Sequence, residues 1–112
     1  MGGVACKSVV EACTLIGCDG SLAIAFDAPP TVAYQIEAIS VTFGVRDFAC
    51  ADPAKCATAS LSGYTPDEVI ITITTASGSR RYNITPQYQD SYPNGQRCGA
   101  ACRNATVTLS MP

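Results

Sequence analysis

The sequence contains no histidine and no tryptophan, and charged residues make up only 14% of its 112 positions. Without histidine the usual general base of hydrolytic enzymes is missing, and the sequence also lacks a Gly-x-Ser-x-Gly nucleophile motif. The balance of 7 basic and 9 acidic residues leaves a net charge of −2, which provides no basic patch for nucleic acid. These absences argue against a catalytic site and against nucleic-acid binding.

Long hydrophobic runs are absent as well, and no window approaches the ~18 uninterrupted apolar residues of a transmembrane helix. The sequence is nevertheless 47% hydrophobic, which is too apolar for a disordered chain. A chain of this length forms one domain, and folding hides roughly two-thirds of the surface that the unfolded chain exposes. We expect one domain over residues 18–112, preceded by a segment over residues 1–17 that is tethered or paired as an edge element.

Cysteine is the residue type that is abundant, with 7 copies in the chain. Disulfides persist in oxidising compartments, and each one contributes about 2–4 kcal/mol to the stability of a small domain. The sequence therefore predicts an extracytoplasmic protein, either secreted, periplasmic or at the cell surface. The disulfide candidates are Cys6, Cys13, Cys18, Cys50, Cys56, Cys98 and Cys102.

Spacing along the chain favours short-range disulfides that clip loops. The favoured pairs are Cys50 with Cys56, Cys98 with Cys102, and Cys13 with either Cys6 or Cys18. A bond between the sheets, from Cys18 to Cys98 or Cys102, is the alternative, because order along the chain does not determine connectivity. One cysteine is left over in either scheme, and we expect it to be Cys6.

The first cysteines have a second interpretation. The small residues before Cys6 and Cys18 resemble the end of a bacterial lipoprotein signal. Lys7 and Glu11 interrupt the apolar stretch that such a signal requires, so disulfide formation is the favoured interpretation. Cys6 stays open between a lipid-modified, a free and an intermolecular cysteine.

The sequence provides no pattern for a metal or a redox site. The Cys-x-x-Cys spacing of zinc knuckles and of dithiol oxidoreductases is missing. Asp67 and Glu68 precede a predicted strand, and we interpret them as solvent-exposed, because a calcium site needs about six to eight oxygen ligands. We therefore expect no metal, no cofactor and no catalytic residue.

Alternating apolar residues separated by Pro and Gly predict short strands throughout the chain. Strands are expected over residues 22–26, 34–45, 57–61, 69–75, 80–85 and 105–111, with the short segment 57–61 at an edge. Within residues 34–45 the apolar phase shifts by one, which predicts a bulge or a tight corner at residues 37–40. Six or seven such strands indicate an all-β fold, an immunoglobulin-like antiparallel β-sandwich stabilised by disulfides.

Three tyrosines in loop-like context form the candidate binding surface, namely Tyr64, Tyr88 and Tyr92. Their rings would suit stacking on a sugar or contact with a protein. The favoured alternative is that they close the ends of the sandwich, with their hydroxyls bonded to backbone. Asn83 and Asn104 begin Asn-x-Thr triplets, which are glycosylation sites in a eukaryotic secretory pathway.

Two parts of the chain carry motifs that point to a family. They are Gly17-Cys18-Asp19-Gly20-x-Leu22, and, later, Pro86-x-Tyr88, Tyr92-Pro93-Asn94-Gly95, Cys98 and Cys102-Arg103-x-Ala105-x-Val107. Together they resemble the short β-sandwich modules of bacterial extracytoplasmic lipoproteins, over about two-thirds of the chain. The resemblance implies a sandwich in the periplasm or on the outer surface, and it implies no particular activity.

These features predict a non-catalytic, secreted or surface-tethered module that binds a protein or a glycan. The alternative is a structural subunit of an extracellular or envelope assembly. Such a subunit would self-associate through the odd cysteine, the N-terminal segment or an edge strand.

Overall fold

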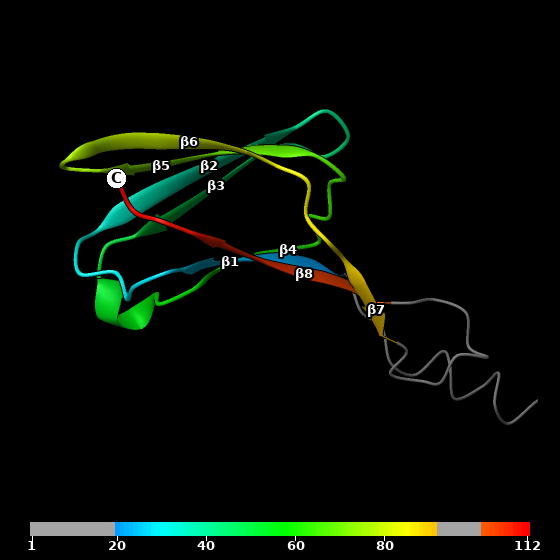
Figure 1. Ribbon diagram of the computed structural model, residues 1–112, viewed down its shortest axis with the longest axis horizontal. Coiled ribbons are helices and arrows are strands. Elements are labelled where there is room, and N and C mark those ends of the chain that lie inside the picture. Colours follow the sequence, from blue (N-terminus) through cyan, green and yellow to red (C-terminus); the bar gives the residue numbers. More distant parts are fainter. Residues whose placement is uncertain (1–19, 92–101) are drawn as a thin grey trace, which may run out of the picture.

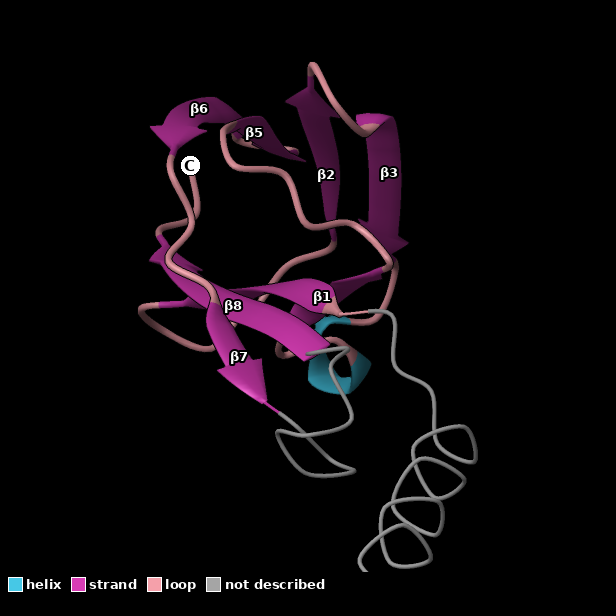
Figure 2. Cartoon of the chain, turned by 90° about the vertical axis from the view of Figure 1, so that its right-hand side faces the viewer, coloured by secondary structure: helices cyan, strands magenta, loops and turns pink. Residues whose placement is uncertain are grey.

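A computed structural model describes residues 20–91 and 102–112 and folds them into two packed β-sheets (Figure 1). The first sheet has the strand order β4 (Ala59–Ser62), β1 (Ser21–Phe26), β8 (Cys102–Leu109), β7 (Gln89–Ser91). The second sheet has the order β3 (Gly44–Cys50), β2 (Tyr34–Ser40), β5 (Val69–Thr75), β6 (Gly78–Ile84). Figure 2 shows the two sheets as separate layers. The predicted all-β, disulfide-stabilised sandwich is confirmed.

The connections between strands cross repeatedly from one sheet to the other. Neighbouring strands are antiparallel except for β1 and β8, which run parallel from Ser21 opposite Asn104 to Phe26 opposite Leu109. The described residues form eight strands rather than six or seven, because the segment 34–45 contributes to two strands and β7 lies in a stretch expected to be a loop. Immunoglobulin-like domains share this two-layer architecture, although strand order varies among sandwich proteins.

The hairpin of β2 and β3 has no bulge, and of the two predicted alternatives the structure has the tight corner, which directly follows Ser40 instead of lying within residues 37–40. The register is continuous from Tyr34 opposite Cys50 to Ser40 opposite Gly44, and the turn covers residues 41–43. The phase shift in the sequence arises because the apolar residues of the second phase face solvent instead of the core. A strand with apolar residues on both faces shows the same pattern as a strand that slips in register.

The core lies between the inner faces of the two sheets and is built from alternate residues of the strands. The opposite residues of β2 and β5 are solvent-facing, which matches the period of two in the sequence. The largest core side chains are Leu22, Ile24, Tyr34, Ile36, Tyr64, Ile71 and Ile73. The predicted hairpin of β5 and β6 and the last strand, with Ala105 and Leu109 facing inward, are confirmed.

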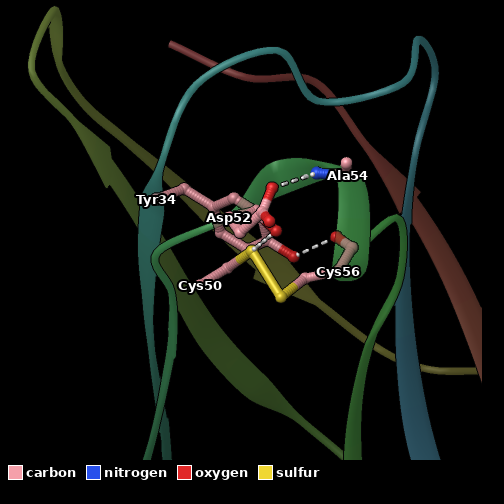
Figure 3. Close-up of a disulfide and its surroundings, with 5 residues drawn as sticks. All are labelled: Tyr34, Cys50, Asp52, Ala54 and Cys56. Atoms are coloured by element: carbon pink, nitrogen blue, oxygen red, sulfur yellow. Dashed lines mark hydrogen bonds between the residues drawn. A yellow bond between two sulfur atoms is a disulfide. The ribbon is translucent and has the colours of Figure 1, made fainter.

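A disulfide clips the connection between β3 and β4 (Figure 3). Cys50 ends β3, and Cys56 follows a 3-10 turn, η1 (Pro53–Lys55). The turn begins at Asp52, whose side chain accepts a hydrogen bond from the Ala54 N–H at 3.1 Å. The Tyr34 hydroxyl donates to the Cys56 carbonyl at 2.7 Å. The clip therefore joins the end of the second sheet to the segment that enters the first.

Candidate binding surface

The outer face of the second sheet is uncovered by any described segment (Figure 1 and Figure 2). Its outward side chains form three rows, each crossing β3, β2, β5 and β6 in that order. The apolar row is Val45, Ile39, Ile70 and Asn83, the charged row is Asp47, Glu37, Thr72 and Arg81, and the third row is Ala49, Gln35, Thr74 and Ser79. The face thus changes from apolar to polar along the strand direction.

Exposed apolar side chains gather at the end of this face where β2 turns into β3. We call them, together with the half-buried Ile70 on β5, the apolar patch, which consists of Ile39, Val41, Phe43, Val45 and Ile70. Val41 is fully exposed at 103%, and Val45 is exposed at 59%. Single exposed apolar residues are ordinary on protein surfaces, but grouped ones mark interaction sites.

The turn that carries the apolar patch is held by several contacts. The Phe43 N–H donates to the Ser40 hydroxyl at 3.0 Å, and the Tyr64 hydroxyl donates to the Gly44 carbonyl at 2.8 Å. The Phe43 ring meets the Tyr64 ring edge to face, with 5.7 Å between the centroids. A surface that is ordered before binding loses less conformational entropy when a partner arrives.

An open groove of about 710 Å³ continues the apolar patch toward β6. The ends of β2, β5 and β6 line the groove. Ile39, Ile70 and Asn83 of the apolar row belong to this lining, and Asn83 lies on the edge strand β6. Glu68, which precedes β5, adds a carboxylate to its wall. The groove suits an apolar side chain with polar groups at its margin.

The charged row separates charges of opposite sign across the sheet. Asp47 and Glu37 lie directly opposite each other on β3 and β2, where like charges destabilise a strand pair. Arg81 lies at the other end of the row, on β6. Among residues 20–91 and 102–112 the only ion pair joins Arg103 to Asp67 at 3.5 Å, so these three charges face solvent without an ionic partner.

The candidate tyrosines do not form an exposed binding surface in the described structure. Tyr64 is 1% exposed, which overturns its assignment to such a surface. Tyr88 is half-buried, its hydroxyl donates to the Pro66 carbonyl at 2.8 Å, and the Arg103 guanidinium lies 4.4 Å from its ring centroid. Burial raises the pKa of Tyr88. Both hydroxyls are bonded to backbone carbonyls, as the favoured alternative predicted, and Tyr92 lies outside the described residues.

The predicted pair of Cys50 and Cys56 is confirmed. Cys102 is also disulfide-bonded. The remaining candidates, Cys6, Cys13, Cys18 and Cys98, lie outside the described residues, as does the proposed segment 1–17.

Both sequon asparagines have exposed side chains on strands. Asn83 ends the apolar row on β6, and Asn104 lies on β8, where its side-chain oxygen accepts a hydrogen bond from the Ser21 hydroxyl at 3.0 Å. A glycan at Asn83 would therefore stand beside the groove.

The described residues also bear on metal and membrane sites. Across residues 20–91 and 102–112, no group of three or more acidic or cysteine side chains is placed to hold a metal ion. In the same part of the chain, no helix is long and apolar enough to cross a membrane. Asp67 and Glu68 are both exposed, and Asp67 contacts Arg103.

Sequence reasoning missed the apolar patch because it interpreted the apolar residues at 39–45 as a phase shift within the predicted strand 34–45. The sequence does contain one signal that these residues face outward. Residues 34–38 already supply a complete apolar face, so a second apolar phase in the same strand has to face outward unless another layer covers it.

No family model, curated protein or solved structure matches this chain. The fold and the surface together define a small all-β sandwich with an ordered, uncovered apolar patch on one sheet.

Proposed function

We propose that this protein is a non-catalytic extracytoplasmic binding module whose partner is a protein that covers the apolar patch. The exposure of four apolar side chains on one hairpin, Ile39, Val41, Phe43 and Val45, carries this proposal. Water contact with grouped apolar side chains is unfavourable, and a partner would remove it at roughly 25 cal/mol per Å² of apolar surface.

The chemistry of the patch supports a protein partner over a glycan. Sugars stack on flat, exposed aromatic rings, whereas this patch is mainly aliphatic and its one ring, Phe43, packs edge to face against Tyr64. The hydroxyls of Tyr64 and Tyr88 are engaged with backbone carbonyls. Aliphatic side chains around a groove are typical of the centre of a protein interface.

The disulfides support an extracytoplasmic location. Cys50 is buried and bonded to Cys56, and thiols of cytosolic proteins are kept reduced. The resemblance to modules of bacterial lipoproteins supports the same compartment. An engineered protein directed to the periplasm should therefore be recovered with this bond formed.

A random peptide library displayed on phage tests the binding function directly. We expect the selected peptides to share an aliphatic or aromatic anchor and to lose affinity for the Val41→Asp variant. The loss should be roughly tenfold or more, because burying a valine contributes about 1.5–3 kcal/mol. Val41 has no packing role that the substitution would disturb, since its side chain is fully exposed.

The matched control is Val32→Asp, which makes the same change at an exposed valine in the connection between β1 and β2. Binding should be unaffected by it. Equal affinity for the wild-type protein and the Val41→Asp variant would refute the proposed site. Binding to a glycan array that survives Val41→Asp would favour the glycan alternative.

A further inference from the structure

We infer that the protein partner is a second copy of this chain, packed face to face through the outer face of the second sheet. This inference rests on the proposed function and specifies the partner of the same patch. It follows from the order of side chains across the four strands in the apolar and charged rows. In each row, this order complements the same order read in the opposite direction.

A two-fold axis parallel to the strands would pair the two faces in this way. Such an axis reverses the strand order of one copy relative to the other, so that β3 faces the partner's β6 and β2 faces the partner's β5. Positions along the strands are unchanged, and each row therefore meets itself reversed. Interfaces of this isologous kind are the commonest in protein dimers.

The apolar row lies at one end of this interface and places its isoleucines on the two inner strands. Ile39 meets the partner's Ile70, and Ile70 meets the partner's Ile39, because β2 and β5 are the two inner strands. Val45 meets the partner's Asn83 at the margin. The contact between isoleucines would remove their apolar surface from water.

The charged row becomes complementary in the same arrangement. Asp47 meets the partner's Arg81, and Arg81 meets the partner's Asp47, so two pairs of opposite charges form. The repulsion between Asp47 and Glu37 within one copy is offset by the partner's guanidinium. Charge complementarity of this kind selects the register of an interface and speeds association.

The size of the face predicts a reversible dimer. Four strands spaced about 4.8 Å apart, each contributing seven residues at about 3.3 Å, give a face of roughly 400 Å² per copy. Stable interfaces bury about 800 Å² per partner. We therefore expect the dimer to dissociate on dilution.

Charge-swap variants in sedimentation velocity test the inference on the full, oxidised chain. The wild-type protein should shift from monomer to dimer between about 10 μM and about 1 mM, a range typical of weak, transient association. Asp47→Arg alone and Arg81→Asp alone should each weaken association tenfold or more, since like charges then face each other twice. An equimolar mixture of the two variants should restore the dimer, because both facing pairs are again of opposite sign.

Asp90→Arg on β7 and Lys55→Asp in η1 are the matched controls, with the same charge changes at exposed positions away from the face. They should leave the association of the wild-type protein unchanged. The inference is overturned if the wild-type protein stays monomeric or if Asp47→Arg and Arg81→Asp leave the dimer unchanged. It is also overturned if the dimer dissociates only when disulfides are reduced. A monomer that still binds selected peptides through Val41 would overturn this inference and leave the proposed function standing.

Discussion

Removal of the disulfide between Cys50 and Cys56 should lower the free energy of unfolding by an amount set by the length of the loop that it closes. The two residues are separated by 6 positions, with Cα atoms 6.0 Å apart. For a loop of this size the chain-entropy relation assigns about 2.4 kcal/mol to the cross-link at 25 °C. We propose the double variant Cys50→Ala/Cys56→Ala, because alanine avoids placing a polar group at the buried position 50.

The disulfide is expected to act partly through Tyr34. Its hydroxyl bonds to the Cys56 carbonyl, and its ring packs against Phe26 and Phe48 with centroids 5.1 and 6.2 Å away. In the wild-type background Tyr34→Phe should cost about 0.5–1.5 kcal/mol, the usual net value of a hydrogen bond. In the background without the disulfide the cost should be smaller, because the Cys56 carbonyl is no longer held in place.

Urea denaturation followed by circular dichroism measures these changes in the free energy of unfolding. Circular dichroism replaces tryptophan fluorescence, because the chain lacks tryptophan. With a slope of about 1–3 kcal/mol per molar urea, the midpoint should fall by roughly 1–2 M in the double variant. Intact mass under non-reducing conditions should verify that the other disulfides are unchanged. A loss below about 0.5 kcal/mol would refute the reasoning and would assign the order of this loop to η1 and its Asp52 cap.

Three further predictions concern stability. Gly20→Ala should lower the free energy of unfolding in urea more than Gly63→Ala does. Both glycines have positive φ, at 75° and 70°, which costs an alanine about 1–2 kcal/mol. Only at Gly20 does the added Cβ also clash with a backbone atom, the Arg103 carbonyl oxygen. Equal losses would contradict the role of this close approach. Tyr64→Phe should lower the free energy of unfolding by about 0.5–1.5 kcal/mol through loss of the bond to the Gly44 carbonyl, and an unchanged midpoint would show that this bond does not stabilise the turn. Burial raises the pKa of Tyr34 above the ordinary value of 10.0 for tyrosine, so the unfolded chain loses this proton first and stability should fall as pH rises above 10.0. Urea midpoints across this pH range should fall less steeply in Tyr34→Phe, and identical slopes in the two proteins would oppose the assignment.

The elements that the sequence predicted well are those with local causes. The hairpin of β5 and β6 follows from the β-branched run of β5 and from the short turn before Gly78, the first residue of β6. The final strand follows from strict alternation that buries Ala105 and Leu109. The bond between Cys50 and Cys56 follows from short spacing, because a short loop brings its ends together at low entropic cost.

The elements that the sequence predicted poorly depend on contacts between distant residues. The parallel pairing of β1 with β8 joins the two ends of the described chain, and no local pattern specifies it. Tyr64 occupies a loop-like sequence and is buried because Phe43 packs against it and Gly44 accepts its hydroxyl. The same distant packing leaves Val41 and Val45 at the surface, where the sequence showed only a shift in the apolar phase.

The sequence by itself determined the all-β class and the strands with a single apolar face, because alternation and turn residues act over a few positions. It also indicated an oxidising compartment, because the cysteine count is a property of composition. Only the tertiary structure decided which apolar face is covered and which side chains share a row. Those outcomes depend on sheet packing and on the register between strands far apart in the chain, and a period of two is identical for a buried face and an exposed one.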